Sequence, residues 1–346
     1  MRLKGISYDV GRVMGGNWRP HFDQRIALRE LEIIKNDLHC NAVRICGLDV
    51  GRLMATAETA LRLGLEVWLS PEMWDAGQEK TLKYITAAAA TAEKLRERWP
   101  DRLVFLVGSE LTLFMQGIVE GRTIVKRMSN PSFWNNARAG KHNEPLNAFL
   151  KNANEKVREV FHGQVSYASL VWENVDWSMF DFIGVDHYRI AQIRDRYIDL
   201  LKPFFSSGKP VVVTEFGYRT YRGAESGKGG GGDIVDHMSL YLGRIPLLGR
   251  FVRPKLKGAF IRDEHLQATE LADQLRELDA AGIDGGFIMT FVSPIFPYDS
   301  DPKYDLDMGN YSLVKTYADG NRGTTYPDMA WEPKEAFWKV AEFYAL

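Results

Sequence analysis

The sequence predicts a (β/α)8 barrel that occupies residues 1–346 as a single domain. Short apolar runs alternate with longer amphipathic stretches almost from end to end, and eight such runs can be counted. Each run is apolar on both faces, which is typical of a parallel sheet covered by helices. A doubly wound sheet also alternates, but it usually has fewer strands and a glycine-rich phosphate loop after the first. Here YDVGRVMGGNW follows, which does not fit GxGxxG.

The predicted strands and helices follow one another in a single series. In chain order the strands are Lys4–Tyr8, Ala42–Cys46, Glu66–Ser70, Leu103–Gly108, Gln164–Ser169, Phe182–Val185, Pro210–Thr214 and Gly286–Thr290. Apolar residues at helical spacing predict helices over Phe22–Leu38, Leu53–Leu63, Gln78–Arg98, Glu144–Phe161, Ile190–Ser206 and His265–Ala281. Glycines at the ends of several helices mark the turn into the next strand, as at Gly64, Gly208 and Gly282.

One segment, Tyr218–Glu264, interrupts this rhythm as an insertion between the seventh strand and its helix. Unstructured connections of this length are usually lids or interfaces. We therefore expect residues 218–264 either to pack over the barrel mouth or to form a contact between subunits of a homo-oligomer. The glycine-rich stretch Gly223–Asp233 has GxxxGK rather than GxxxxGK spacing, so we expect a flexible loop there and not a nucleotide site.

Composition excludes several classes of partner. With 44 basic and 45 acidic side chains the net charge is near zero, which argues against binding of nucleic acid or of an anionic membrane by bulk electrostatics.

The two cysteines, Cys40 and Cys46, form no metal-binding spacing and fit a reducing compartment. No apolar signal core precedes the first strand, so we expect a cytoplasmic protein, with no metal and no cofactor.

Residues at the C-terminal ends of the strands are the candidates for chemistry, because active sites of such barrels lie at that face. Acids and aromatic rings are concentrated there. The candidates are Asp9, Arg44, Glu72, Trp74, Ser109, Glu110, Trp172, Asp186, His187, Tyr188, Glu215 and Phe291. Glu173, which follows Trp172, is expected to support the site rather than to react.

Two of these residues, Glu110 and Glu215, end the apolar runs LVFLVGSE and PVVVTEFG on the fourth and seventh strands. Either glutamate alone could be an ion-paired residue of the barrel rim. Together they suit cleavage of a glycosidic bond, in which one carboxyl group protonates the departing oxygen and a carboxylate attacks or stabilises the anomeric carbon. Retention of configuration requires the two groups about 5 to 5.5 Å apart, and inversion roughly 6.5 to 9.5 Å.

In this respect the chain resembles the large clan of retaining glycoside hydrolases with (β/α)8 barrels, whose acid/base glutamate ends strand four and whose nucleophile ends strand seven. The resemblance implies that Glu110 is the acid/base and Glu215 the nucleophile. It also matches Arg44 to the clan's strand-two arginine, and His187 and Tyr188 to its strand-six pair, in which the tyrosine bonds to the nucleophile. The implied activity is hydrolysis of a carbohydrate by double displacement.

The chain departs from the clan pattern at two places. Ser109 stands where the clan usually has an asparagine that binds the sugar 2-hydroxyl, and Phe291 is the nearest aromatic residue to the place of the strand-eight tryptophan. Serine has a shorter reach and a single hydroxyl, so the contact with the 2-hydroxyl is lost, bridged by water or supplied by another residue. These departures concern the identity of the sugar more than the type of reaction.

A second resemblance is to bacterial proteins called abortive infection proteins. The stretches similar to that family are FDQRIALRELEIIKNDLHCNAVRI, VGSELTLF, VVVTEFGYRTYRGA and TYPDMAWEPK. This resemblance and Ser109 leave open an alternative, a barrel that binds carbohydrate or a partner in phage defence without turnover. A third reading, a metal-dependent lyase or isomerase, requires several acids and His187 to converge on one ion.

Some of the candidate residues could have a structural role instead of a functional one. Arg44 is expected either to clamp Glu215 in its ionised form or to be a plain buried ion pair. Trp74 and Trp172 either stack on sugar faces or pack the rim. For His187 we expect a hydrogen bond to the substrate or to the nucleophile rather than to a metal.

Overall fold

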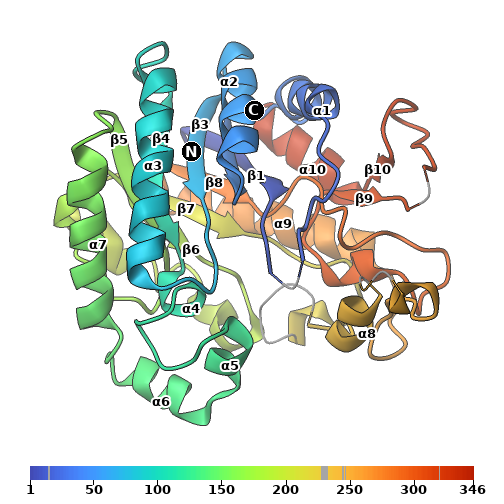
Figure 1. Cartoon of the computed structure of the whole chain (residues 1–346). Coiled ribbons are helices and arrows are strands. Elements are labelled where there is room, and N and C mark those ends of the chain that lie inside the picture. Colours follow the sequence, from blue (N-terminus) through green and yellow to red (C-terminus); the bar gives the residue numbers. More distant parts are fainter. Residues whose placement is uncertain (15, 227–232, 244, 246, 319) are drawn as a thin grey trace.

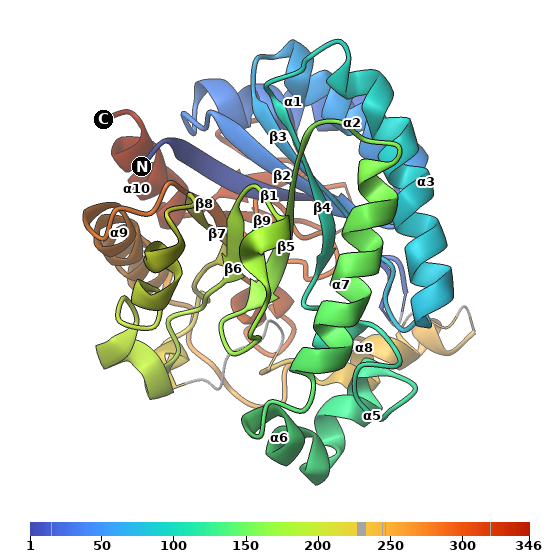
Figure 2. The same ribbon diagram turned by 90° about the vertical axis from the view of Figure 1, so that its left-hand side faces the viewer.

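The computed structural model describes residues 1–346 except 15, 227–232, 244, 246 and 319. Eight parallel strands, β1 to β8, form a closed barrel in which each strand pairs with the next in sequence and β8 pairs with β1. Helices surround this barrel (Figures 1 and 2). The predicted (β/α)8 fold is confirmed.

Each predicted strand overlaps an observed one. The strands are β1 Leu3–Gly11, β2 Ala42–Gly47, β3 Glu66–Pro71, β4 Leu103–Ser109, β5 Gln164–Leu170, β6 Ile183–Asp186, β7 Val211–Phe216 and β8 Gly285–Ile288. The barrel closes where Leu3 lies opposite Gly285 and Ile6 opposite Ile288. Register shifts near the C-terminal ends of β4, β6 and β7 turn the side chains there relative to a regular ladder.

Three of the six outer helices that the structure describes begin after an aspartate that caps them. The six are α1 Gln24–Asn36, α2 Val50–Arg62, α3 Gln78–Arg96, α7 Asn143–Arg158, α9 Glu264–Ala280 and α10 Glu335–Tyr344. The side chains of Asp23, Asp49 and Asp263 accept hydrogen bonds from backbone N–H groups in the first turns of α1, α2 and α9. α10 packs against α9, and its Tyr344 hydroxyl donates to the carbonyl of Gly5 on β1 at 3.0 Å.

Shorter elements gather beyond the C-terminal ends of the strands. They are α4 Leu111–Phe114, α5 Ile124–Ser129, α6 Pro131–Arg138 and α8 His237–Leu242, which lie at the bottom of Figure 1. A small antiparallel pair, β9 Val314–Thr316 and β10 Trp331–Pro333, follows β8. These segments shape the end of the barrel at which Glu110 and Glu215 emerge.

The helix predicted over Ile190–Ser206 is wrong. In its place the chain forms two 3-10 turns, Ala191–Arg196 and Lys202–Ser207. Pro203 stands at the start of the second turn. Because proline lacks the N–H of the helical hydrogen bond and its ring clashes with the preceding turn, a continuous helix cannot pass through this position.

The segment Tyr218–Glu264 connects β7 to α9 and is more regular than an unstructured loop. It contains α8, and Tyr221 pairs with Arg262 and Val235 with Leu256 in short antiparallel bridges. Within the glycine-rich stretch Gly223–Asp233, residues 227–232 lie outside the described residues.

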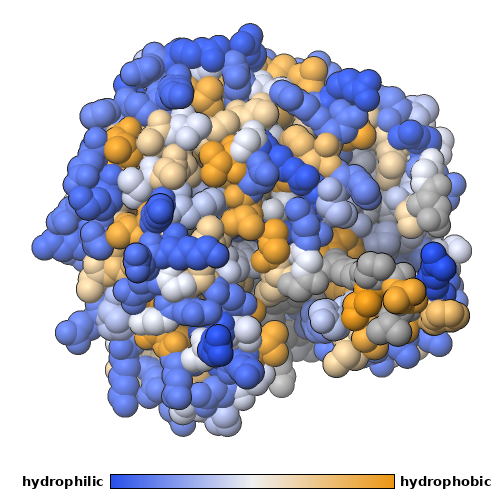
Figure 3. Space-filling model, in the orientation of Figure 1, coloured by the Kyte–Doolittle hydropathy of each residue, from blue (hydrophilic) through white to orange (hydrophobic). Residues whose placement is uncertain are grey.

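Apolar side chains are also exposed on this segment. The large ones are Met238, Tyr241, Leu247, Phe251 and Ile261. Figure 3 shows hydrophobic surface at the lower right, over the region of α8. In the described part of the chain, every helix is too short or too polar to cross a membrane.

A separate apolar cluster fills the N-terminal end of the barrel interior. Trp68 is its largest member, and the centre of its ring lies 5.1 Å from that of Phe182 and 5.3 Å from that of Phe287. Leu3, Ala42 and Val212, near the starts of their strands, belong to the same cluster. The N-terminal end of the barrel is therefore a packed core, and the polar side chains are left for the C-terminal end.

We expect Trp68→Ala to lower the free energy of unfolding by about 3–5 kcal/mol, because it leaves a cavity between Phe182 and Phe287 that neighbouring strands cannot close. Urea unfolding followed by circular dichroism measures the change. Trp338→Ala, at a position that is 49% exposed on α10, is the matched control and should cost less than about 1 kcal/mol. Equal losses for the two variants would contradict the packing role of Trp68.

Candidate active site

Glu110 emerges from β4 through a strained turn. Its backbone has φ 46° and ψ 44°, a left-handed conformation that is uncommon for residues other than glycine. Two hydrogen bonds hold the turn: the Glu110 N–H donates to the carbonyl of Ala168 at 2.8 Å, and the Leu111 N–H donates to the Tyr167 hydroxyl at 2.8 Å. The turn places a carboxylate oxygen of Glu110 within 4.8 Å of oxygens of Asp186 and Glu215.

Glu173, which follows β5, forms hydrogen bonds with residues next to this turn. Its carboxyl group accepts hydrogen bonds from the Tyr167 hydroxyl at 3.0 Å, the Leu170 N–H at 3.0 Å and the Thr112 N–H at 3.3 Å. Burial raises the pKa of Glu173 to about 7 although these hydrogen bonds oppose the shift. Glu173 thus contacts the turn that carries Glu110.

Glu215 emerges from β7 into a cationic environment. Arg44 Nη1 lies 2.7 Å from Glu215 Oε1, Arg12 Nη1 lies 3.6 Å from the same oxygen, and the Tyr188 hydroxyl donates to Oε2 at 2.7 Å. Burial alone would raise the pKa of Glu215, but the charges of Arg44 and Arg12 and the hydrogen bond from Tyr188 outweigh it, and the pKa falls below its ordinary value. Glu215 is therefore ionised at neutral pH.

The two arginines join the first three strands to this carboxylate. Arg44 is fully buried, and its Nη2 contacts Glu72 Oε1 at 3.2 Å and the Ser70 hydroxyl at 3.3 Å. Arg12 pairs with Asp9 at 3.0 Å and lies 3.6 Å from Glu72. The sequence analysis did not identify Arg12 as a site residue. The signal that could have identified it is its position just after β1 and three residues after Asp9, a candidate acid. Asp9 and Glu72 orient the arginines that surround Glu215.

Three carboxyl groups meet at the centre of the site. One carboxylate oxygen of each of Glu110, Asp186 and Glu215 lies within 4.8 Å of the other two. Burial and then the charges of Asp186 and Glu215 raise the pKa of Glu110 well above its ordinary value. The site thus pairs a carboxyl group that ionises readily, Glu215, with one that holds its proton to higher pH, Glu110.

His187 does not face these carboxyl groups. Its ring stacks on Tyr197 with centres 4.3 Å apart, and its Nε2 lies 2.7 Å from the Tyr197 carbonyl oxygen. Side chains alternate along a strand, so Asp186 inside the barrel places His187 outside it. Burial there lowers the pKa of His187 to about 4. The expected hydrogen bond from His187 to the substrate or nucleophile is wrong, and the ring does not converge with the acids as a metal-dependent reading requires.

Phe291 is also a core residue rather than a wall of the site. It is fully buried, with its ring centre 5.4 Å from that of Trp331 and 6.5 Å from that of Phe337. The side chain therefore packs between β10 and α10, and Phe291, which the sequence predicted to bind substrate or to support the site, lies in the core.

The candidate tryptophans lie in two aromatic groups. Trp74 stacks on Phe114 with centres 4.3 Å apart, contacts Trp18 edge-on at 5.3 Å, and lies 5.8 Å from the guanidinium carbon of Arg12. This group borders the cationic side of the site. Trp172 is partly exposed in a second group, with Phe133, Trp134 and His142.

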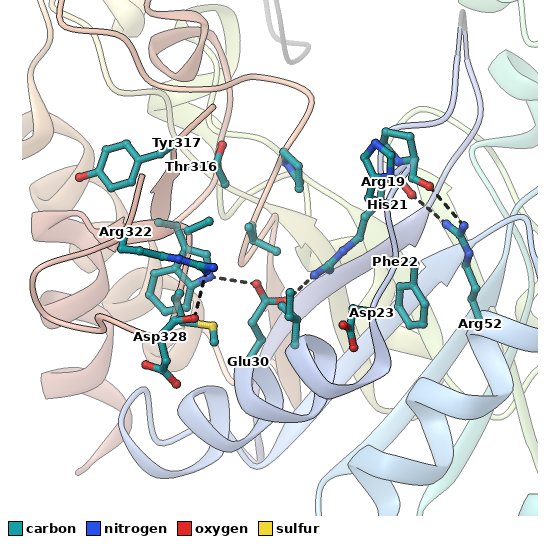
Figure 4. Close-up of a pocket in the computed structure, with 17 residues that line it drawn as sticks. Arg19, His21, Phe22, Asp23, Glu30, Arg52, Thr316, Tyr317, Arg322 and Asp328 are labelled. Atoms are coloured by element: carbon teal, nitrogen blue, oxygen red, sulfur yellow. Dashed lines mark hydrogen bonds and ion pairs between the residues drawn. The ribbon is translucent and has the colours of Figure 1, made fainter. Parts of the chain in front are cut away.

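A cavity of about 480 Å³ lies beside the site, between the segment after β1 and the β9–β10 pair (Figure 4). At its floor Arg19 pairs with Glu30 at 2.6 Å, and Trp331 donates to Glu30 at 2.9 Å. Arg19 also donates to the backbone carbonyl of Asp9 at 3.2 Å. None of the three clustered carboxyl groups lines this cavity, so it is a neighbour of the candidate site and not its centre.

Comparison with known proteins gives matches in structure only. No family model and no curated protein matches the chain. A solved GH113 β-1,4-mannanase matches with a TM-score of 0.61 and 15% identity, over 99% of each chain. The GH113 β-mannanase of Alicyclobacillus acidocaldarius matches with 0.56 and 16%, over 99% of this chain and 97% of that chain. These proteins share the fold.

Two further neighbours extend the range of that fold. A glycoside hydrolase family 5 enzyme from Prevotella bryantii has a TM-score of 0.53 and 12% identity over 99% of this chain and 96% of its own. β-Glucuronidase 2 of Bacteroides uniformis has 0.59 and 15% over 99% of this chain but only 35% of its own. The resemblance to abortive infection proteins has no counterpart among these matches.

We expect Tyr167→Phe to lower the free energy of unfolding by about 1–3 kcal/mol, because it leaves the buried Leu111 N–H without an acceptor and removes a donor from Glu173. Chemical denaturation measures this loss. Tyr241→Phe, at a tyrosine that is 55% exposed, is the matched control and should be neutral. A Tyr167→Phe protein as stable as the wild type would show that the hydroxyl does not hold the turn at Glu110.

Proposed function

We propose that the chain is a retaining glycoside hydrolase in which Glu215 is the nucleophile and Glu110 the acid/base. The observation that carries the proposal is the separation of at most 4.8 Å between oxygens of these two carboxyl groups at the C-terminal end of the barrel. This is close to the spacing of about 5 to 5.5 Å in retaining enzymes, and shorter than the roughly 6.5 to 9.5 Å of inverting ones.

The opposite pKa shifts of the two groups support the assignment of roles. Glu215 attacks the anomeric carbon as the leaving oxygen takes the proton of Glu110, and a glycosyl ester forms on Glu215. Glu110, now ionised, then removes a proton from water, which attacks the anomeric carbon and releases Glu215. Arg44 and Tyr188 hold the attacking carboxylate, and both contact it directly.

The substrate we propose is a carbohydrate. The solved neighbours include β-1,4-mannanases and a β-glucuronidase, which supports this class although identity is only 15% in both cases. Trp18 and Trp74 border the site next to Arg12, and flat aromatic rings of this kind complement the C–H faces of sugar rings.

A second candidate is a barrel that binds carbohydrate or a protein partner without turnover. Ser109 favours this candidate. Its hydroxyl donates to Asp186 at 3.3 Å, whereas the asparagine that is usual at this place binds the 2-hydroxyl of the sugar. Turnover distinguishes the two candidates.

We expect the wild-type protein to cleave at least one member of a panel of aryl pyranosides and furanosides. Glu215→Ala should fall to the background rate, because no other group forms the ester. Glu110→Gln should lose about 10²–10⁴-fold in kcat/KM on substrates with poor leaving groups and less on activated ones. Release of the aryl group measures each rate.

Binding of an oligosaccharide by Glu215→Ala, measured by calorimetry, is the control for a folded site. If Glu215→Ala cleaves the substrate as fast as wild type, the nucleophile assignment is wrong. If wild type binds an oligosaccharide but cleaves none of the panel, the non-catalytic candidate is preferred.

The pH dependence of kcat/KM should be bell-shaped. Glu215 must be ionised, so activity falls as pH drops through its lowered pKa; Glu110 must hold its proton, so activity falls as pH rises through its raised pKa. The alkaline limb should therefore lie well above the ordinary glutamate pKa of about 4.3. Glu110→Gln should lose that limb and keep the acidic one, and an unchanged alkaline limb would remove Glu110 from the acid/base role.

A further inference from the structure

Asp186 belongs to the three-carboxyl cluster, yet the proposed mechanism gives it no role. Its side chain is fully buried at the end of β6, so it does not meet a substrate directly. Its Oδ1 accepts from the Thr214 hydroxyl at 2.6 Å and lies 3.8 Å from Arg44 Nη1, and its Oδ2 accepts from Ser109 at 3.3 Å. A buried acid beside two reacting acids needs an explanation, because each added charge there is costly.

The local charges do not compensate all five acids of the site. Among the described residues, the cations in contact with the site's acids are Arg12 and Arg44. They contact Asp9, Glu72 and Glu215, and Arg44 also lies 3.8 Å from Asp186. Two positive charges are thus shared among four carboxyl groups, the contact with Asp186 is the longest of them, and neither arginine contacts Glu110. Asp186 and Glu110 therefore compete to remain neutral, and their protons form one coupled system.

Hydrogen bonding decides which of the two ionises first. The hydroxyls of Thr214 and Ser109 and the nearby charge of Arg44 stabilise the anion of Asp186. In the part of the chain that the structure describes, no side chain donates a hydrogen bond to the Glu110 carboxyl group. Asp186 thus gives up its proton first, and its anion, within 4.8 Å, then opposes ionisation of Glu110.

We propose that Asp186 is a positioning residue that keeps the proton on Glu110 from the buried side of the site. This inference rests on the proposed function for its catalytic meaning. The groups that face the coupled pair come from five strands. They are Arg44 on β2, Glu72 after β3, Ser109 on β4, Glu173 after β5, and Thr214 and Glu215 on β7.

The electrostatics of Asp186 agree with this role. Burial and then the charge of Glu215 raise the pKa of Asp186 to about 8, although Arg44 and Thr214 oppose the shift. Asp186 thus ionises near the upper end of the neutral range. At that pH its charge delays the loss of the proton from Glu110, and the proton donor is preserved over a wider range of pH.

The first test is the pH dependence of kcat/KM for Asp186→Asn, whose amide keeps the size of the side chain and can still accept from Thr214. We expect the alkaline limb to move to lower pH by about one unit, because Glu110 no longer ionises against a neighbouring anion. Thr214→Val, which keeps the carboxyl group but removes its 2.6 Å hydrogen bond, should move the limb in the same direction by less.

Asp9→Asn is the matched control. It removes a buried carboxylate of the same site that pairs with Arg12 and lies outside the three-carboxyl cluster. Its rate can change, but its alkaline limb should stay in place. A purely structural role of Asp186 would lower activity at all pH values without moving the limb, and that result would overturn the proposal.

The second test needs no substrate. Infrared difference spectra across a pH titration follow protonated carboxyl groups directly, and the signal lost in Glu110→Gln identifies Glu110. That signal should disappear at lower pH in Asp186→Asn than in wild type, and titration at the same pH would overturn the inference. If the Glu110 signal disappears at lower pH in Asp186→Asn but no glycoside is cleaved, the proposed function fails and the inference stands. If the protein cleaves a glycoside with the help of Glu215 but the pH of the signal does not change, the proposed function stands and the inference fails.

Discussion

The buried guanidinium of Arg44 is the interaction on which the candidate site depends. It lies on β2 and contacts Glu72 after β3 and Glu215 on β7, so it links strands on different sides of the barrel. Burial opposes its charge, but the surrounding carboxylates keep its pKa above the ordinary value. A buried charge that loses its partner costs several kcal/mol, so the positions of these acids are tied to one another through this one cation.

This arrangement explains how the two glutamates acquire opposite pKa shifts. Glu215 lies against Arg44 and the Tyr188 hydroxyl, which stabilise its anion. Glu110 lies beyond the reach of the arginines' hydrogen bonds and faces two other acids. The contrast comes from placement by the strands, because β7 delivers its carboxylate to the cations while the strained turn after β4 delivers the other to the acids.

The fold and the central pair could be predicted because they depend on features that one sequence carries. Apolar runs located the eight strands, and the acid at the end of a run located Glu110 and Glu215. His187 could not be placed, because a shift of one residue along β6 decides which side chain faces inward. Arg12 was missed because it follows β1 in an irregular segment without periodicity. Asp186 acquires its role only through neighbours on β4 and β7, distant in the sequence.

The pairing of β1 with β8 has a consequence for how the protein is made. Leu3 lies opposite Gly285, so the barrel cannot close until the ribosome has produced most of the chain. Until then β1 and β7 each have an unpaired edge, which invites association with other chains. Arg44 is also synthesised 171 residues before its partner Glu215. The charge of Arg44 therefore has no Glu215 to pair with while the chain between them is being made. A chaperone that shields the open strand edges during synthesis would benefit this protein.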